Sequence, residues 1–125
     1  MMRKGLRFLP MLLVMAAIFF LSQQPGDSLP MPSFPGADKV AHVIAYATLA
    51  ATAIFAFSPG RRPVVCALIV FAISAAYGAS DEWHQSFIPG RSVDFYDFLA
   101  NCFGAALVAG GWLLWRRARR RGEKQ

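Results

Sequence analysis

Four long apolar runs, separated by short polar segments, dominate the chain. They cover residues 6–21, 40–57, 64–78 and 98–115. About 20 residues of helix cross a bilayer core about 30 Å thick, so apolar runs of this length predict membrane-spanning helices. Allowing for their ends, we expect helices at about 6–24, 39–57, 63–86 and 94–115, followed by a basic tail at 116–125. The chain is then a single all-α membrane domain, 1–125, folded as a compact bundle of four transmembrane helices.

Local signals define the ends of these helices. Pro63 suits the first turn of the third helix, where its missing N–H matters least. Asp38 and Asp94 stand where the N-caps of the second and fourth helices are expected. The third helix is expected to continue to about residue 85, because the next helix breaker is Pro89. Residues 22–39 contain four prolines and predict an extended loop.

The first run also resembles a secretory signal peptide, because basic residues precede an apolar stretch. No small-x-small cleavage site follows it; the next residues are Ser22, Gln23, Gln24 and Pro25. We therefore expect a retained helix.

Basic residues mark one side of the expected bundle. Eleven of the thirteen Lys and Arg residues lie before the first helix, between the second and third, or after the fourth. The other two are Lys39 and Arg91, in the remaining loops. Since loops rich in Lys and Arg stay in the cytoplasm, both termini are predicted to be cytoplasmic. Six of the seven acidic residues fall on the outer side: Asp27, Asp38, Asp81, Glu82, Asp94 and Asp97.

Composition excludes several other classes of protein. With 56% hydrophobic and 16% charged residues, a soluble domain of this length would expose too much apolar surface. The net charge of +6 does not indicate nucleic-acid binding, because the basic residues at 116–124 directly follow an apolar run and have no aromatic residue among them. No disulfide is expected, since Cys66 and Cys102 fall in different helices near opposite faces of the membrane.

Small residues recur at four-residue spacing on three helices, which lets helix backbones approach closely in lipid. An ordinary alanine-rich composition explains any single pair almost equally well. The pairs are Ala41 and Ala45, Ala72 and Ala76, and Ala100 and Gly104.

Polar side chains break the apolar pattern on the outer side of the expected bundle. On each of the last three helices they recur three or four residues apart and so share one face. Polar groups within a membrane are costly unless they face protein or water, so we expect them to line one shallow, outward-facing pocket. The Pro89–Gly90 turn is expected to bring an arginine back over this pocket. The candidates are Asp38, His42, Tyr46, Glu82, Gln85, Arg91, Asp97 and Asn101.

Each of these residues alone has a simpler explanation. Asp38 and Asp94 can be helix caps, Asn101 can join two helices, and His42 can bond a carboxylate. Packing alone does not explain the whole set, because it does not require so many different polar groups at one depth.

The pocket residues suggest two roles. A carboxylate beside a histidine can act as an acid–base pair, so Glu82, His42 and Asp97 are the candidate catalytic residues if the protein is an enzyme. The expected binding residues are Asp38, Tyr46, Gln85, Arg91 and Asn101.

No metal or other cofactor is expected from the sequence. His42, Glu82, His84 and Asp97 have the right side chains, but no compact ligand motif such as H-E-x-x-H joins them. The outer loops carry an excess of acids, which favours protons, cations or ligands with amines and hydroxyls. An anionic ligand would depend on the two basic residues of these loops.

Five short segments carry a family resemblance: D-K-V-A-H-V-I-A-Y at 38–46, Y-G at 77–78, D-E-W-H-Q at 81–85, P-G-R-S at 89–92 and D-F-L-A-N-C-F-G at 97–104. In this order and spacing they resemble the VanZ-like family of small bacterial membrane proteins. The resemblance implies that the eight pocket residues are the family's characteristic polar positions. The family is named for a protein associated with resistance to the glycopeptide antibiotic teicoplanin.

The resemblance implies a multi-pass protein of the bacterial cytoplasmic (inner) membrane and cell envelope. The pocket is then expected to bind a lipid-linked or cell-wall component and to influence susceptibility to teicoplanin-type antibiotics. Membrane lipids and a lipid-linked cell-wall precursor are the expected partners. Two alternatives stay open: an intramembrane enzyme that modifies a lipid headgroup or cell-wall lipid precursor, and a proton- or cation-coupled transporter. The transporter is less favoured, because the polar residues stop in the outer half of the helices.

Overall fold

The computed structural model describes residues 3–25 and 34–125. A short 3-10 helix, η1 (Lys4–Phe8), leads into α1 (Leu9–Ser22), and α2 (Ala37–Phe57), α3 (Pro63–Gln85) and α4 (Phe95–Gly122) follow. The described residues contain no strand. With η1 and α1 taken together as Lys4–Ser22, four helices are long and apolar enough to cross a membrane. The prediction of an all-α bundle of four membrane-spanning helices is confirmed.

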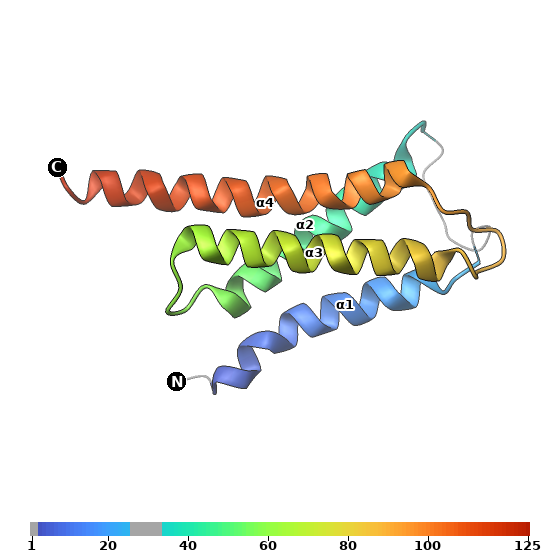
Figure 1. The fold of residues 1–125 in the computed structure, drawn as a ribbon, viewed down its shortest axis with the longest axis horizontal. Coiled ribbons are helices and arrows are strands. Elements are labelled where there is room, and N and C mark those ends of the chain that lie inside the picture. Colours follow the sequence, from blue (N-terminus) through green and yellow to red (C-terminus); the bar gives the residue numbers. More distant parts are fainter. Residues whose placement is uncertain (1–2, 26–33) are drawn as a thin grey trace.

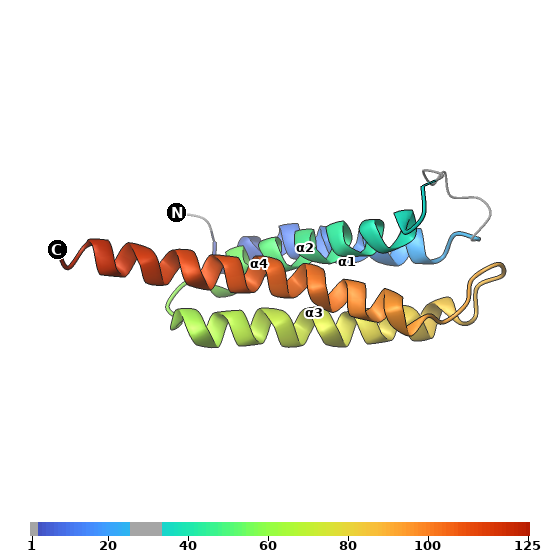
Figure 2. The same cartoon turned by 90° about the horizontal axis from the view of Figure 1, so that it is seen from above.

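The helices run along one long axis (Figures 1 and 2). The start of η1, the α2–α3 turn and the end of α4 lie at one end of the bundle, and the C-terminal ends of α1 and α3 lie at the other (Figure 1). The described basic residues therefore gather mainly at the first end. Arg7, for example, reaches the C-terminal part of α2, where its Nε and Nη2 donate to the carbonyl oxygen of Phe55 at 3.1 and 2.9 Å.

The helix ends agree with the sequence signals in two places and differ in two. Pro63 begins α3, and Asp94 caps α4 by accepting a hydrogen bond from the backbone N–H of Tyr96 at 2.8 Å. The prediction that Asp38 caps the second helix is wrong, because α2 begins at Ala37 and its N-cap is Gly36. Gly36 has a φ of 80°, a left-handed conformation that glycine adopts without strain.

The other difference is the length of α4, which continues through the arginine-rich segment to Gly122 instead of ending near residue 115. Arginine is a good helix former, and no proline interrupts this segment. Part of the expected Pro-rich loop, with Asp27, lies at residues 26–33, outside the described residues.

Close packing between α2 and α4 forms the centre of the bundle. A Cβ added to Gly104 would fall inside the contact distance of the Val43 carbonyl oxygen, so only glycine permits this approach. Ala105 and Ala109 of α4 and Leu49 of α2 are buried in the same core. The close approach of helix backbones expected at the small residues is therefore found at Gly104, where α4 meets α2.

The outside of the bundle is apolar. Many large hydrophobic side chains are exposed along the helices, among them Leu13, Phe20, Leu68 and Leu114. In a membrane these side chains face lipid, so they carry no penalty. Ala72 and Ala76 of α3 also lie on this outer surface. Cys66 and Cys102 are unpaired, as the sequence predicts.

Candidate ligand-binding site

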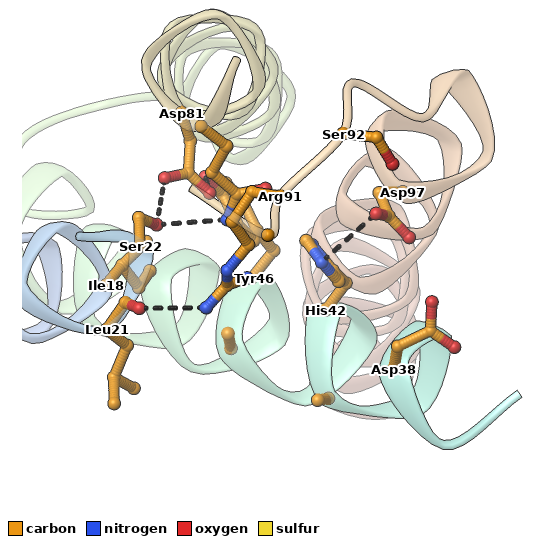
Figure 3. Close-up of a pocket in the computed structure, with 14 residues that line it drawn as sticks. Ile18, Leu21, Ser22, Asp38, His42, Tyr46, Asp81, Arg91, Ser92 and Asp97 are labelled. Carbon is orange, nitrogen blue, oxygen red and sulfur yellow. Dashed lines mark hydrogen bonds and ion pairs between the residues drawn. The ribbon is translucent and has the colours of Figure 1, made fainter. Parts of the chain in front are cut away.

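A cavity of about 570 Å³ lies between the C-terminal ends of α1 and α3 and the first turns of α2 and α4. Side chains from all four helices and from the α3–α4 connection form its wall (Figure 3). Its apolar part comes from Ile18 and Leu21 of α1 and from Ala41 and Ala45 of α2. The polar part consists of Ser22, Asp38, His42, Tyr46, Asp81, Gln85, Arg91, Ser92 and Asp97.

Lys39 gathers three carboxylates at the first turns of α2 and α4. Its Nζ donates to Asp38 Oδ2 at 2.8 Å, to Asp94 Oδ2 at 2.8 Å and to Asp97 Oδ1 at 2.6 Å. The hydrogen bond from Lys39, followed by the one from the Tyr96 backbone, lowers the pKa of Asp94 from its usual value. One ammonium group thus joins the starts of two helices and neutralises only part of the negative charge around it.

His42 connects α2 to α4 by both of its ring nitrogens. Nδ1 lies 2.7 Å from Asn101 Oδ1, and Nε2 lies 3.6 Å from Asp97 Oδ2. An amide oxygen only accepts hydrogen bonds, so in this arrangement Nδ1 carries the proton. In the neutral imidazole, Nε2 then keeps a free lone pair on the side of Asp97.

Glu82 brings a second carboxylate to the same place from α3. It is only 5% exposed. Its Oε2 accepts a hydrogen bond from the backbone N–H of Asp94 at 3.4 Å, whereas Oε1 has no hydrogen-bond partner among the described residues. One ligand atom each of His42, Glu82 and Asp97 lie within 4.8 Å of one another. Three helices therefore place these three side chains together.

A second polar cluster joins α1 to α2 and α3. The hydroxyl group of Ser22 donates to the Asp81 carboxylate and accepts from Gln85 Nε2 at 3.3 Å. The hydroxyl group of Tyr46 donates to the other Asp81 oxygen at 3.4 Å. All four residues are buried. Because a buried carboxylate is costly without hydrogen-bond donors, this arrangement explains why Ser22 and Tyr46 point at Asp81.

Arg91 lies where the α3–α4 connection returns to the bundle. Its Nε donates to the carbonyl oxygen of Gln24 and its Nη2 to that of Leu21, both at 3.1 Å. The last carbonyls of a helix lack partners within the helix, so Arg91 satisfies the end of α1 while it lines the cavity (Figure 3). Gly90, with a φ of 75°, makes the turn. The expected return of Arg91 over the bundle is confirmed.

The geometry can be compared with known protein families. A family model described as VanZ/LLP1 matches residues 7–116. The chain belongs to the VanZ/LLP1 family. The match includes both polar clusters and nearly the whole bundle, and it confirms the resemblance that the sequence motifs carry. Family membership and four apolar helices together make this VanZ-family chain a multi-pass membrane protein. The comparisons found no matching curated protein and no matching solved structure.

All eight site residues expected in this VanZ-family chain lie in one region. Six of them line the cavity: Asp38, His42, Tyr46, Gln85, Arg91 and Asp97. Asn101 is fully buried and bonds His42, and Glu82 is buried beside His42 and Asp97. His84, by contrast, stacks on Phe19 with ring centroids 5.0 Å apart and is not one of the three clustered residues.

The structure adds three residues that the sequence did not single out for the VanZ site. Ser22 ends α1, at the boundary where the expected first helix (6–24) and the expected loop (22–39) overlap. Lys39, expected only as one of two basic residues available to an anionic ligand, donates to the carboxylates of Asp38, Asp94 and Asp97. Asp81 lies four residues before Gln85 and shares its face, a spacing that could have identified it.

Proposed function

We propose that this VanZ-family protein binds a lipid-linked or cell-wall component in its cavity, on the outer side of the bacterial inner membrane. Occupation of the cavity then influences susceptibility to teicoplanin-type glycopeptides. The observation that carries the proposal is a cavity lined by both polar and apolar side chains, at the end of the bundle opposite most of the basic residues.

The charge distribution supports this orientation. The described segments around Arg7, at Arg61–Arg62 and after Trp115 lie at the end away from the cavity (Figure 1). Under the positive-inside rule that end is cytoplasmic, so the N- and C-termini are cytoplasmic and the cavity opens at the outer leaflet. A cavity at that leaflet would be accessible to lipid-linked cell-wall components on the outer side of the membrane.

The cavity wall supports an amphiphilic ligand. A volume of about 570 Å³ falls within the range of about 300–1,000 Å³ for small-molecule pockets. Ile18 and Leu21 offer apolar contact for a lipid chain, while Asp38, Ser92 and Tyr46 offer hydrogen bonds to hydroxyl or amine groups. A polar headgroup with an attached chain matches both kinds of lining residue.

Filling the cavity tests the proposal without changing a charged residue. Ala45 of α2 lines the cavity, whereas Ala51 of the same helix is exposed on the outside of the bundle. In a deletion strain, Ala45→Phe should fail to restore wild-type glycopeptide susceptibility, and Ala51→Phe at equal membrane abundance should restore it. Full restoration by Ala45→Phe would refute cavity binding.

A second candidate is an intramembrane enzyme acting on a lipid headgroup or wall precursor. It is favoured by Glu82 beside His42 and Asp97, because Oε1 of Glu82 has no hydrogen-bond partner among the described residues. Glu82 or Asp97 would accept a proton from a hydroxyl nucleophile, and His42 would complete the acid–base pair. Lipid and wall-precursor profiles of wild-type and Glu82→Gln strains test this activity. Catalysis predicts that a product is lost and its substrate accumulates, whereas identical profiles would exclude it.

A further inference from the structure

We propose that His42, Glu82 and Asp97 bind one divalent transition-metal ion, for which Zn²⁺ is the best match. This site does not depend on the ligand-binding function proposed above. It also departs from the expectation drawn from the sequence, because the three ligands come from three helices and leave no compact motif.

The distances suit a metal ion with only small side-chain movements. In a tetrahedral zinc site with ligands at about 2.0–2.2 Å, neighbouring ligand atoms are about 3.4 Å apart. His42 Nε2 and Asp97 Oδ2 are 3.6 Å apart, and the three ligand atoms of the group all lie within 4.8 Å of one another. Binding of an ion would therefore require only a small rotation of the Glu82 side chain toward His42 and Asp97.

Each of the three side chains is held by its other polar atom. Asn101 contacts Nδ1 of His42, Lys39 donates to Oδ1 of Asp97, and the Asp94 backbone N–H donates to Oε2 of Glu82. Metal ligands are commonly oriented in this way by partners on their second atom, and these partners tune affinity. The contact to Asn101 leaves the lone pair of His42 on Nε2, the atom nearest Asp97.

Glu82 Oε1 gives independent support for a ligand at this place. The residue is 5% exposed, yet this oxygen has no hydrogen-bond partner among the described residues. Buried polar atoms are normally satisfied, and an unsatisfied carboxylate oxygen is among the most costly. A cation between Glu82, His42 and Asp97 would satisfy this oxygen. It would also balance the charge of the two carboxylates, of which Lys39 contacts only that of Asp97.

The ligand set indicates which ion would bind. One imidazole nitrogen and two carboxylate oxygens match Zn²⁺ or similar first-row ions better than Ca²⁺ or Mg²⁺, which prefer oxygen alone. Three protein ligands leave a coordination position open, as in catalytic zinc sites. Because His42 and Asp97 also line the cavity, the ion would lie beside the space that a ligand would occupy.

Metal binding can be measured on the full chain in detergent, purified through a tag without histidines. We expect wild-type protein to bind about one equivalent of Zn²⁺, and bound Co²⁺ to give visible absorption bands. His42→Ala and Glu82→Gln should abolish both signals. Asn101→Ala, which removes only a positioning residue, should weaken affinity by about 10–100-fold.

His84→Ala is the matched control, because it removes the other histidine of the chain and leaves the three proposed ligands in place. This variant should bind Zn²⁺ like the wild type. The proposal is overturned if folded wild-type protein binds no stoichiometric ion, or if His42→Ala binds as tightly as His84→Ala. Failure of the cavity-filling test, with Zn²⁺ binding intact, would refute the proposed function but not the metal site.

Discussion

Ser22, the last residue of α1, donates a hydrogen bond to the carboxylate of Asp81 in the interior of the bundle. The two residues are 59 positions apart. Two other contacts join α1 to α3 farther from its end: the Tyr77 hydroxyl donates to the carbonyl oxygen of Met15 at 2.6 Å, and His84 stacks on Phe19. The first helix is thus fastened to the bundle at the cavity. This contact gives α1 a structural role in the site in addition to membrane anchoring.

Replacing Ser22 by Ala should loosen α1. Asp81 would lose one of its two hydroxyl donors, so we expect the free energy of unfolding to fall by about 1–2 kcal/mol, the range for buried hydrogen bonds in proteins and membrane bundles. Thermal unfolding in detergent measures this change. Ser80→Ala is the control, because Ser80 is exposed and its hydroxyl donates to the carbonyl oxygen of Tyr77 in its own helix. Equal unfolding midpoints for the two variants would contradict the role of Ser22.

Replacing Gly104 by Ala should separate α2 from α4. The added methyl group would overlap the Val43 carbonyl, and overpacking of this kind typically costs about 1–3 kcal/mol. Gly110→Ala and Gly111→Ala in the same helix meet nothing within 4 Å and should leave stability unchanged or slightly higher. Thermal unfolding in detergent distinguishes these outcomes. A Gly104→Ala variant as stable as Gly110→Ala would show that the helices do not approach so closely.

The sequence predicted much of this arrangement because hydrophobic runs and helical spacing are local properties. Asp38, His42 and Tyr46 repeat every four residues, so their shared face follows directly from helix geometry. The sequence predicted the wrong N-cap for α2, because both Asp38 and Gly36 are residue types that commonly cap helices. The spacing also does not tell which face meets which helix.

The contacts between helices were therefore harder to predict. Nothing local indicates that Lys39 reaches Asp94 and Asp97 more than fifty residues away. The sequence puts Ser22 at the boundary between the first helix and the following loop, and only the packing of α1 on α3 shows that it bonds Asp81. His42, Glu82 and Asp97 were all named from the sequence, but it could not show that their ligand atoms lie within 4.8 Å of one another, because the three residues belong to three different helices.

Asp94 should make stability depend on pH through its contact with Lys39. The pKa of Asp94 is lowered from its ordinary 3.8, so the contact stabilises the protein above that pH and is lost as the pH falls through the lowered value. Asp94→Asn keeps a good N-cap but removes the charge. We expect this variant to unfold at a lower temperature than wild type at about pH 7 and at the same temperature once the pH lies below the lowered pKa of Asp94. An equal deficit at both pH values would mean that the cap, not the charge, is lost.

Orientation in the membrane can be tested with single cysteines in a chain whose Cys66 and Cys102 are replaced by Ala. Ser92→Cys lies in the exposed α3–α4 connection, and Gln125→Cys lies beyond α4. A membrane-impermeant maleimide added to intact bacterial cells or spheroplasts should label Ser92→Cys and spare Gln125→Cys until the membrane is opened. The reverse pattern would place the cavity on the cytoplasmic side.

The most direct test of the central claim is native mass spectrometry of the protein released from the membrane in mild detergent. If the cavity binds a lipid-linked or cell-wall component, wild type and Ala51→Phe should retain an adduct with the mass of such a molecule, and Ala45→Phe should lose it. An adduct retained equally by Ala45→Phe, or no adduct on the wild type when wall precursors are supplied, would contradict binding in the cavity.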